Sequence, residues 1–190
     1  MRKINSLMEN PFDDIILGSC DVHMEKLYRL GFTPNLLTFI GVIFRIWSIW
    51  SLFNGNKLFF LIGGAIGYYF DCLDGHFARR YDMCTPFGDI FDHLSDTLFQ
   101  VGILYYLLVK SKLPHSKFFI PIVIAYVCFA LLLFCHMGCQ QQHTDFGSEK
   151  LSESLDHLQH LCPDKEWIYW TRYFGCGTAM IFSLALGVIF

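Results

Sequence analysis

One stretch of the chain leaves few options for how the protein can fold. Residues 118–138 (FFIPIVIAYVCFALLLFCHMG) contain no Asp, Glu, Lys or Arg, and an α-helix needs about 20 mostly apolar residues to cross a bilayer. Residues 173–190 are also uncharged, and Trp167, Tyr169 and Trp170 precede them as an interfacial aromatic belt. The sequence therefore predicts an all-α integral membrane protein with several spans.

The composition agrees with this class. Of 190 residues, 54% are hydrophobic and 16% are charged, whereas roughly 25% are charged in an average soluble domain. The mean hydropathy is +0.40, and a chain this short has too much surface to hide so much apolar side chain from water. The net charge of −3 provides no basic surface, which excludes a nucleic-acid partner.

We expect a bundle of five transmembrane helices. Residues 34–53 form the first and carry only Arg45, which within a span needs a carboxylate or a lipid phosphate as partner. The second and third grow from the apolar runs 58–70 and 97–109, which are long enough only if both helices extend through the charged stretch 71–96. The predicted organisation is one domain over 1–190, made of an N-terminal interfacial segment (1–32), four spans (33–138), a polar loop (139–166) and a last span (167–190).

The N-terminal segment carries a short amphipathic pattern. Residues 20–31 place Val22, Leu27 and Leu30 among charges, with Gly31 as a C-cap. This predicts a helix lying at the membrane interface, with an ordinary solvated helix as the alternative. Residues 1–30 hold no sustained apolar run, so we expect no cleavable signal peptide.

Two further features bear on the cellular compartment. Arg79 and Arg80 favour a cytosolic position for the loop between the second and third spans, although three lysines lie in the next loop, on the opposite side. The eight cysteines form no C-x-x-C pair, so we predict buried free thiols rather than a zinc site or a disulfide framework.

Four carboxylates lie where lipid would otherwise surround the helices. Asp71 and Asp74 are three residues apart and Asp92 and Asp96 are four apart, so each pair shares one helix face. An ionised carboxylate at membrane depth costs roughly 2.5–3.5 kcal/mol, and a set of four requires compensation. Two antiparallel helices joined near Thr85 would bring the pairs together, and such an all-oxygen site suits Mg²⁺ or Mn²⁺. The alternative is a set of surface acids at helix ends.

The spacing of these acids predicts phosphoryl transfer. Metal ions held by carboxylates alone usually share a substrate phosphate, and Arg79 has the forked donors to bind a phosphate oxygen. Gly75 and Gly88 lie on the same faces and leave room for another group to approach the backbone. We therefore predict a site in which two ions contact the attacking and leaving oxygens.

The same stretch resembles the signature of the CDP-alcohol phosphotransferase (phosphatidyltransferase) family. It matches all eight fixed positions of D-x2-D-G-x2-A-R-x8-G-x3-D-x3-D, namely Asp71, Asp74, Gly75, Ala78, Arg79, Gly88, Asp92 and Asp96. Upstream, Pro34, Asn35 and Thr38 match the P-N-x-x-T element of the family. Those enzymes are membrane proteins of six helices, and our five predicted spans depart from that number. The family uses a CDP-linked donor, releases CMP and often forms homodimers.

The resemblance implies a role for each matched residue. Asp71, Asp74, Asp92 and Asp96 would bind two Mg²⁺ or Mn²⁺ ions, and Asp96 would also be the catalytic base that deprotonates the acceptor hydroxyl. A metal contact would lower the proton affinity of Asp96, so these two roles compete in part. The residues implied in binding the donor are Asn35, Thr38, Gly75, Arg79 and Thr85.

The resemblance favours a phosphatidyl transfer in phospholipid biosynthesis, from CDP-diacylglycerol to a polar alcohol. The length, Asp74-Gly75-His76 and a polar loop with His136, Gly147 and Lys150 are similar to phosphatidylinositol synthases, which makes inositol the favoured acceptor. Phe91-Asp92-His93 instead resembles choline and ethanolamine phosphotransferases, which would pass a head group from CDP-choline or CDP-ethanolamine to diacylglycerol. A third hypothesis is a non-catalytic membrane protein that binds CDP-lipid or ions, or transports them.

Three other polar residues remain open between two interpretations. His93 is either an acceptor-site base or hydrogen-bond donor, or a helix-end histidine. Arg172 either binds the acceptor or extends to the interface. We expect His136 to be packed or interfacial.

Overall fold

The computed structural model describes residues 4–143 and 153–190, and all regular secondary structure in those residues is helical. This confirms the predicted all-α class. The α-helices are α1 (Pro11–Arg29), α2 (Pro34–Phe53), α3 (Lys57–Arg80), α4 (Pro86–Tyr105), α5 (Phe119–Gln142), α6 (Ile168–Thr171) and α7 (Cys176–Ile189). Short π or 3₁₀ turns supplement them at Tyr106–Lys110, Leu113–His115, Glu153–Leu161, Lys165–Trp167 and Arg172–Phe174.

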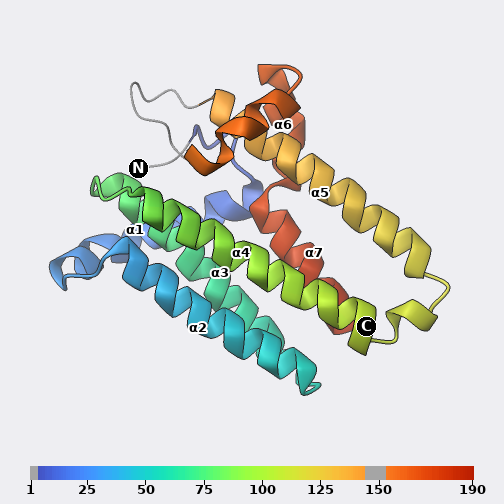
Figure 1. The fold of residues 1–190 in the computed structure, drawn as a ribbon. Helices are drawn as coiled ribbons and strands as arrows, with labels where there is room; N and C mark the ends of the chain where they lie inside the picture. The colour runs from blue at the N-terminus through green and yellow to red at the C-terminus, as the bar shows by residue number, and fades with distance from the viewer. Residues whose placement is uncertain (1–3, 144–152) are drawn as a thin grey trace.

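Four segments within the described residues are long and apolar enough to cross a membrane. They are Pro34–Phe53, Lys57–Arg80, Phe119–Gln142 and Lys165–Ile189. Helix α4 has 20 residues and packs against α2 (Figure 1), but Asp89, Asp92 and Asp96 make it more polar than these four. A fifth span formed by α4 therefore stays a prediction.

The two short apolar runs extend as helices through the charged stretch, as predicted. Helix α3 continues to Arg80, and α4 begins at Pro86 behind Thr85, whose Oγ1 accepts a hydrogen bond from the Gly88 N–H at 3.1 Å. A side-chain oxygen at the N-cap and proline at the first helical position both favour a helix start. The chain reverses between these helices, so all four candidate aspartates lie at one end of the bundle.

Helices α2 and α3 pack closely against each other away from the aspartates, toward the other end of the bundle. A Cβ added to Gly63 would lie 3.0 Å from the Phe44 carbonyl oxygen and 3.0 Å from Ser48 Cβ, so glycine allows the two backbones to approach. The largest buried cluster joins α2, α3, α4 and α7 through side chains that include Leu52, Phe60, Ile103 and Leu184.

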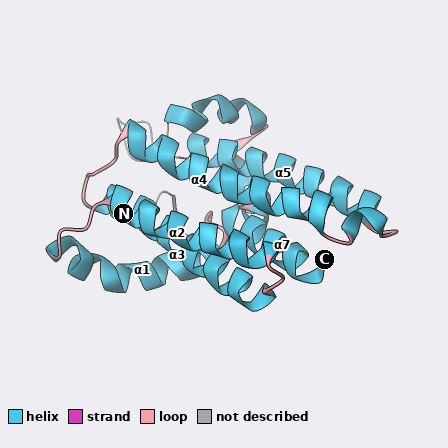
Figure 2. Cartoon of the chain, turned by 60° about the horizontal axis from the view of Figure 1, so that its bottom comes forward, coloured by secondary structure: helices cyan, strands magenta, loops and turns pink. Residues whose placement is uncertain are grey.

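Helix α1 is longer than the sequence analysis predicted. It begins at Pro11 because the Asn10 side chain caps it, accepting a hydrogen bond from the Phe12 N–H at 3.0 Å. It ends before Gly31, which adopts a positive φ of 79° as expected for a C-cap glycine. Helix α1 packs against α3 and α7 and covers one end of the bundle (Figure 2). Its place at a membrane interface stays a prediction.

The predicted polar loop and the predicted free thiols need correction. Helix α5 continues to Gln142, and Glu153–Leu161 forms a 3₁₀ helix that packs on α5, so the loop over 139–166 is shorter and more structured than expected. Cys139 and Cys162 form a disulfide between these two segments. The cysteine spacing did not reveal this bridge, because its two residues are 23 apart in the chain and only the tertiary fold brings them together. The other six cysteines are free, as predicted, but only Cys20 of them is buried, and Cys84 and Cys128 are exposed. Gly147 and Lys150 lie outside the described residues.

The last span, Lys165–Ile189, agrees with the predicted range of 167–190, but it is not one continuous helix. Its helix α7 begins at Cys176, because the turn at Arg172–Phe174 and the extended backbone of Gly175 separate it from α6. Helix α5, by contrast, is continuous and presents Ile120, Ile124, Val127 and Leu131 outward, a spacing that places one apolar face toward lipid.

Candidate active site

A cavity of about 890 Å³ opens at the end of the bundle where α3 and α4 meet. Residues of α1, α2, α3, α4 and the end of α5 line it, together with Leu155 and Cys176. All four candidate aspartates, Asp71, Asp74, Asp92 and Asp96, are among the lining residues. The cavity is large enough for a nucleotide-sized ligand, since small-molecule sites are typically about 300–1,000 Å³.

The structure brings the two pairs of acids together. One carboxylate oxygen from each of Asp71, Asp92 and Asp96 lies within 4.8 Å of the others. Asp74 lines the same cavity with only 3% exposure but is not part of this tight group. Helix periodicity placed each pair on one face, and the reversal between α3 and α4 directs both faces to the same cavity.

Two carboxylate oxygens of this site lack hydrogen-bond partners. Asp74 Oδ2 and Asp92 Oδ1 are buried and unpaired. A buried unpaired carboxylate oxygen is destabilising, and a divalent cation removes that penalty because hard cations prefer carboxylate oxygen ligands. The donor set, all carboxylate oxygens from four aspartates, fits Mg²⁺ or Mn²⁺ rather than a thiolate- or imidazole-binding metal.

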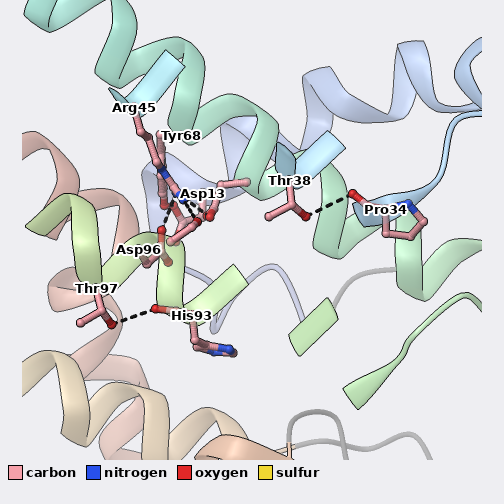
Figure 3. A network of polar contacts seen from close by, with 10 residues as sticks. Asp13, Pro34, Thr38, Arg45, Tyr68, His93, Asp96 and Thr97 are labelled. Carbon is pink, nitrogen blue, oxygen red and sulfur yellow. Dashed lines mark hydrogen bonds and ion pairs between the residues drawn. The ribbon is translucent and has the colours of Figure 1, made fainter. Parts of the chain in front are cut away.

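Arg45 of α2 reaches the cluster from inside the bundle. Its Nη2 donates to Asp71 Oδ1 at 2.6 Å and to Asp96 Oδ1, and its Nη1 donates to Ser95 Oγ. Figure 3 shows the Arg45 side chain directed at Asp96, next to Asp13 and Tyr68. The predicted acidic partner of Arg45 is thereby confirmed, and the guanidinium links α2 to both α3 and α4.

The glycines that the spacing placed beside the acids allow close approach of polar groups. A Cβ on Gly75 would lie 3.2 Å from Arg79 Nη1, so the guanidinium of Arg79 lies over the Gly75 backbone. A Cβ on Gly88 would lie 2.9 Å from Asn35 Oδ1 and 3.0 Å from Thr85 Oγ1. Each glycine therefore leaves space for a polar side chain that lines the cavity.

The structure places all five predicted donor-binding residues, Asn35, Thr38, Gly75, Arg79 and Thr85, on the wall of the cavity. The side chains of two of them also form hydrogen bonds with the backbone. Thr38 Oγ1 donates to the Pro34 carbonyl oxygen at 3.1 Å, and Thr85 caps α4. Their contact with a donor stays a prediction.

The three residues left open by the sequence lie in different places. His93 lines the cavity, and its Nδ1 lies 2.6 Å from the Asp89 carbonyl oxygen on the same helix. His136 is packed, as expected, with 1% exposure and with Nδ1 3.2 Å from Thr171 Oγ1. Arg172 donates to the Leu7 carbonyl oxygen and lies outside the cavity lining, so it ties the N-terminal segment to the end of the bundle.

Sequence analysis missed the contribution of α1 to the cavity. Asp13 of α1 lines it together with Glu9, which precedes the helix, and Tyr68 of α3, and the Tyr68 hydroxyl donates to Asp13 Oδ1. Burial raises the pKa of Asp13 to about 7 against the effect of that hydrogen bond, and the nearby charge of Glu9 adds to the rise. The sequence Asn10-Pro11 could have predicted the start of α1. No local pattern indicates that this helix packs over the acidic end of the bundle.

Comparison with known proteins gives a consistent set of relatives. The family profile described as CDP-alcohol phosphatidyltransferase matches residues 32–151. Archaetidylinositol phosphate synthase of Pyrococcus horikoshii is 29% identical over 103 residues, which cover 54% of this chain and 55% of that protein. Phosphatidylinositol phosphate synthase of Mycobacterium tuberculosis is 32% identical over 88 residues, covering 43% of this chain and 40% of that protein.

A third relative matches a larger share of this chain. Ethanolaminephosphotransferase 1 of Homo sapiens is 23% identical over 151 residues, which cover 69% of this chain and 38% of that protein. The chain thus spans about half of the archaeal relative and smaller shares of the other two. No solved structure gives a significant match.

Proposed function

Because the chain belongs to the CDP-alcohol phosphatidyltransferase family, we propose that it acts in phospholipid biosynthesis. The proposed reaction transfers a phosphatidyl group from CDP-diacylglycerol to a polar alcohol and releases CMP. The observation that carries this proposal is the convergence of Asp71, Asp92 and Asp96 within 4.8 Å, at a cavity that Arg79 and the other predicted donor-binding residues also line.

The metal component of the proposal rests on the donor set. Asp71, Asp74, Asp92 and Asp96 would hold Mg²⁺ or Mn²⁺, two ions as the family resemblance implies, and the unpaired oxygens of Asp74 and Asp92 support this assignment. When bound, such ions supply positive charge to the attacking and leaving oxygens. The four aspartates would contribute by fixing where that charge lies.

The remaining chemistry is assigned to side chains of this protein. The acceptor hydroxyl oxygen forms a bond to the β-phosphorus of the donor, the bond from that phosphorus to the bridging oxygen breaks, and CMP leaves with that oxygen. Asp96 takes the hydroxyl proton. Since its Oδ1 already accepts from Arg45, we assign the proton to Asp96 Oδ2. Arg79 would bind a donor phosphate oxygen through its forked donors.

We propose free inositol as the acceptor. Two relatives carry inositol in their names, although those names refer to inositol phosphate lipids. In the described part of this chain, Arg79 is the one lysine or arginine that lines the cavity, while seven aspartates and glutamates do so: Glu9, Asp13, Asp71, Asp74, Asp89, Asp92 and Asp96. With Arg79 assigned to the donor, an acceptor phosphate would find no second lysine or arginine among the described lining residues, so an unphosphorylated alcohol fits better.

A second candidate function is head-group transfer from CDP-ethanolamine or CDP-choline to diacylglycerol. The human ethanolaminephosphotransferase matches more of this chain than the inositol-type relatives do, and His93 lines the cavity. An acidic cavity also suits a cationic head group.

The test is CMP release by the purified, detergent-solubilised protein with CDP-diacylglycerol and Mn²⁺ or Mg²⁺. Inositol, inositol 1-phosphate, serine, glycerol 3-phosphate and ethanolamine are added one at a time, and a second series uses CDP-ethanolamine or CDP-choline with diacylglycerol. We expect CMP with CDP-diacylglycerol and free inositol, and none from Asp96→Asn. Release only in the second series would establish the alternative, and no release in either by folded protein would support a non-catalytic or transport role.

We propose that the cavity faces the cytosol, as Arg79 and Arg80 indicate. The disulfide lies at the same end of the bundle, since Met137 and Gln140 of the disulfide-bearing end of α5 line the cavity. Disulfides form in oxidising compartments, so in a cytosolic orientation Cys139 and Cys162 would be thiols in the cell. Alkylation of intact cells decides between the two: a bridge that resists alkylation places the cavity in an oxidising compartment.

A further inference from the structure

The cation already built into the acidic cluster has no place in the proposed reaction. Arg45 is 4% exposed and comes from the middle of α2. Its guanidinium takes one oxygen of Asp71 and one of Asp96 and is also bound to Ser95. Arginine stays protonated in proteins, so this is a permanent positive charge among the candidate metal ligands.

The surroundings of Arg45 are shaped to hold the side chain where it lies. A Cβ on Gly67 would lie 2.8 Å from Arg45 Cγ, so the absence of a side chain at Gly67 makes room for the arginine. The Phe99 ring centroid lies 6.0 Å from Arg45 Cζ. The described residues that line the cavity include the four aspartates but not Arg45, which therefore contacts Asp71 and Asp96 from inside the protein.

As a result, the four aspartates fall into two pairs that differ in their hydrogen-bond partners. Asp71 and Asp96 each have one oxygen occupied by Arg45, whereas Asp74 Oδ2 and Asp92 Oδ1 are buried with no partner. A divalent ion that binds Asp71 and Asp96 must share these carboxylates with a positive charge close by, and like charges at short distance repel strongly away from bulk water.

We propose that Arg45 is the internal counter-ion of the acidic cluster. It holds Asp71 and Asp96 together in the metal-free protein, and it competes with the divalent ion for these two carboxylates. An ion bound mainly through Asp74 and Asp92 is affected less. This proposal rests on the proposed metal site and concerns how strongly that site binds its ions, independently of which alcohol is the acceptor.

The counter-ion role predicts two effects of opposite sign for Arg45→Met. Without metal, the variant leaves the carboxylates without their cation, so it should unfold at a lower temperature than the wild type in EDTA. With Mn²⁺, the variant should bind the ion held by Asp71 and Asp96, which is the more weakly bound one in the wild type, with a dissociation constant lower by more than about tenfold. The reason is that one positive charge near that ion has been removed. A residue with a merely structural role would lower both the stability and the affinity.

The experiment is a titration of the purified protein with Mn²⁺, in which the EPR signal of free Mn²⁺ reports binding, combined with thermal unfolding in EDTA and in excess Mn²⁺. Arg45→Gln removes the charge but keeps an amide that can bond to Ser95, and it must show the same tightening if Arg45→Met does not fold. Arg45→Lys keeps the charge and should stay within about threefold of the wild-type affinity. Arg29→Met, at an exposed pair with Glu25, serves as the control.

Three outcomes would overturn the proposal. Unchanged or weaker Mn²⁺ binding in both Arg45→Met and Arg45→Gln would show that Arg45 does not compete with the ion. Equal stability of wild type and Arg45→Met in EDTA would show that it does not hold the metal-free cluster. No Mn²⁺ binding by folded wild-type protein would overturn the metal site itself, and with it the proposed function, which distinguishes that failure from the first two.

Discussion

Replacing Asp13 by Asn tests how α1 closes the acidic end of the bundle. Asp13 Oδ1 accepts from the Tyr68 hydroxyl, and Asp13 Oδ2 lies 3.4 Å from the Gly177 N–H. The titratable groups that act on it are Glu9 of the N-terminal segment and Tyr68, Asp71 and Cys72 of α3, and Cys176 of α7 acts in turn on Tyr68. Burial among them raises the pKa of Asp13 from 3.8 to about 7.

This raised pKa makes the stability of the protein depend on pH. Between pH 3.8 and about 7 the unfolded chain releases the Asp13 proton and the folded protein keeps it, so the free energy of unfolding falls as the pH rises through that range. At about 1.4 kcal/mol per pH unit, the full loss is about 4 kcal/mol, and about 3 kcal/mol of it falls between pH 5 and pH 8.5. The stabilising contribution is complete below pH 3.8 and gone above about 7.

Asn does not titrate, so Asp13→Asn escapes this loss. Thermal unfolding of both proteins is measured in one detergent with EDTA, at pH 5 and at pH 8.5. The unfolding temperature of the variant relative to that of the wild type should be higher by roughly 5–10 °C at pH 8.5 than at pH 5. Other carboxylates titrate in both proteins, so their effects on the unfolding temperature largely cancel when the variant is compared with the wild type. A difference in unfolding temperature between the variant and the wild type that is the same at both pH values would refute the argument. Tyr68→Phe, which removes a hydrogen bond to the charged form, should enlarge the pH dependence.

Three further predictions concern the base, the disulfide and the helix packing. Asp96→Asn should lower CMP release by about 100-fold or more while CDP binding, measured by calorimetry, stays within about threefold of the wild type; full activity would remove Asp96 as the base. Cys139→Ser should lower the free energy of unfolding of the oxidised protein by about 3 kcal/mol, because the bridge closes a loop of 23 residues, and the effect should vanish in reducing buffer. Gly63→Ala should destabilise the protein by about 1–3 kcal/mol because the new Cβ meets backbone of α2, whereas Gly18→Ala, where a Cβ meets nothing within 4 Å, should stabilise it by about 0.5–1 kcal/mol; equal effects in denaturant unfolding would contradict the packing argument.

Local patterns were sufficient for the helices and for the shared faces of the acids. Apolar runs near 20 residues depend on residues close in the chain, which is why α2 matches the predicted range 34–53 and why α3 and α4 continue through the charged stretch and join near Thr85, as expected. Arg79 and Arg80, expected in the loop between them, belong to the last turn of α3 instead. The pairing of Asp71 with Asp74 and of Asp92 with Asp96 follows from helix periodicity alone.

Contacts between distant segments could not be read in this way. The sequence showed that Arg45 needed an anion, but its choice of Asp71 and Asp96 depends on α2 packing against both α3 and α4. The positions of Glu9 and Asp13 at the cavity and the Cys139–Cys162 bridge also depend on contacts between distant segments. Hydrophobic packing is non-directional, so the pattern of an apolar face says that a helix must be covered without saying which helix covers it; that choice depends on complementary shapes, such as Gly67 beside Arg45, which exist only once the helices are assembled.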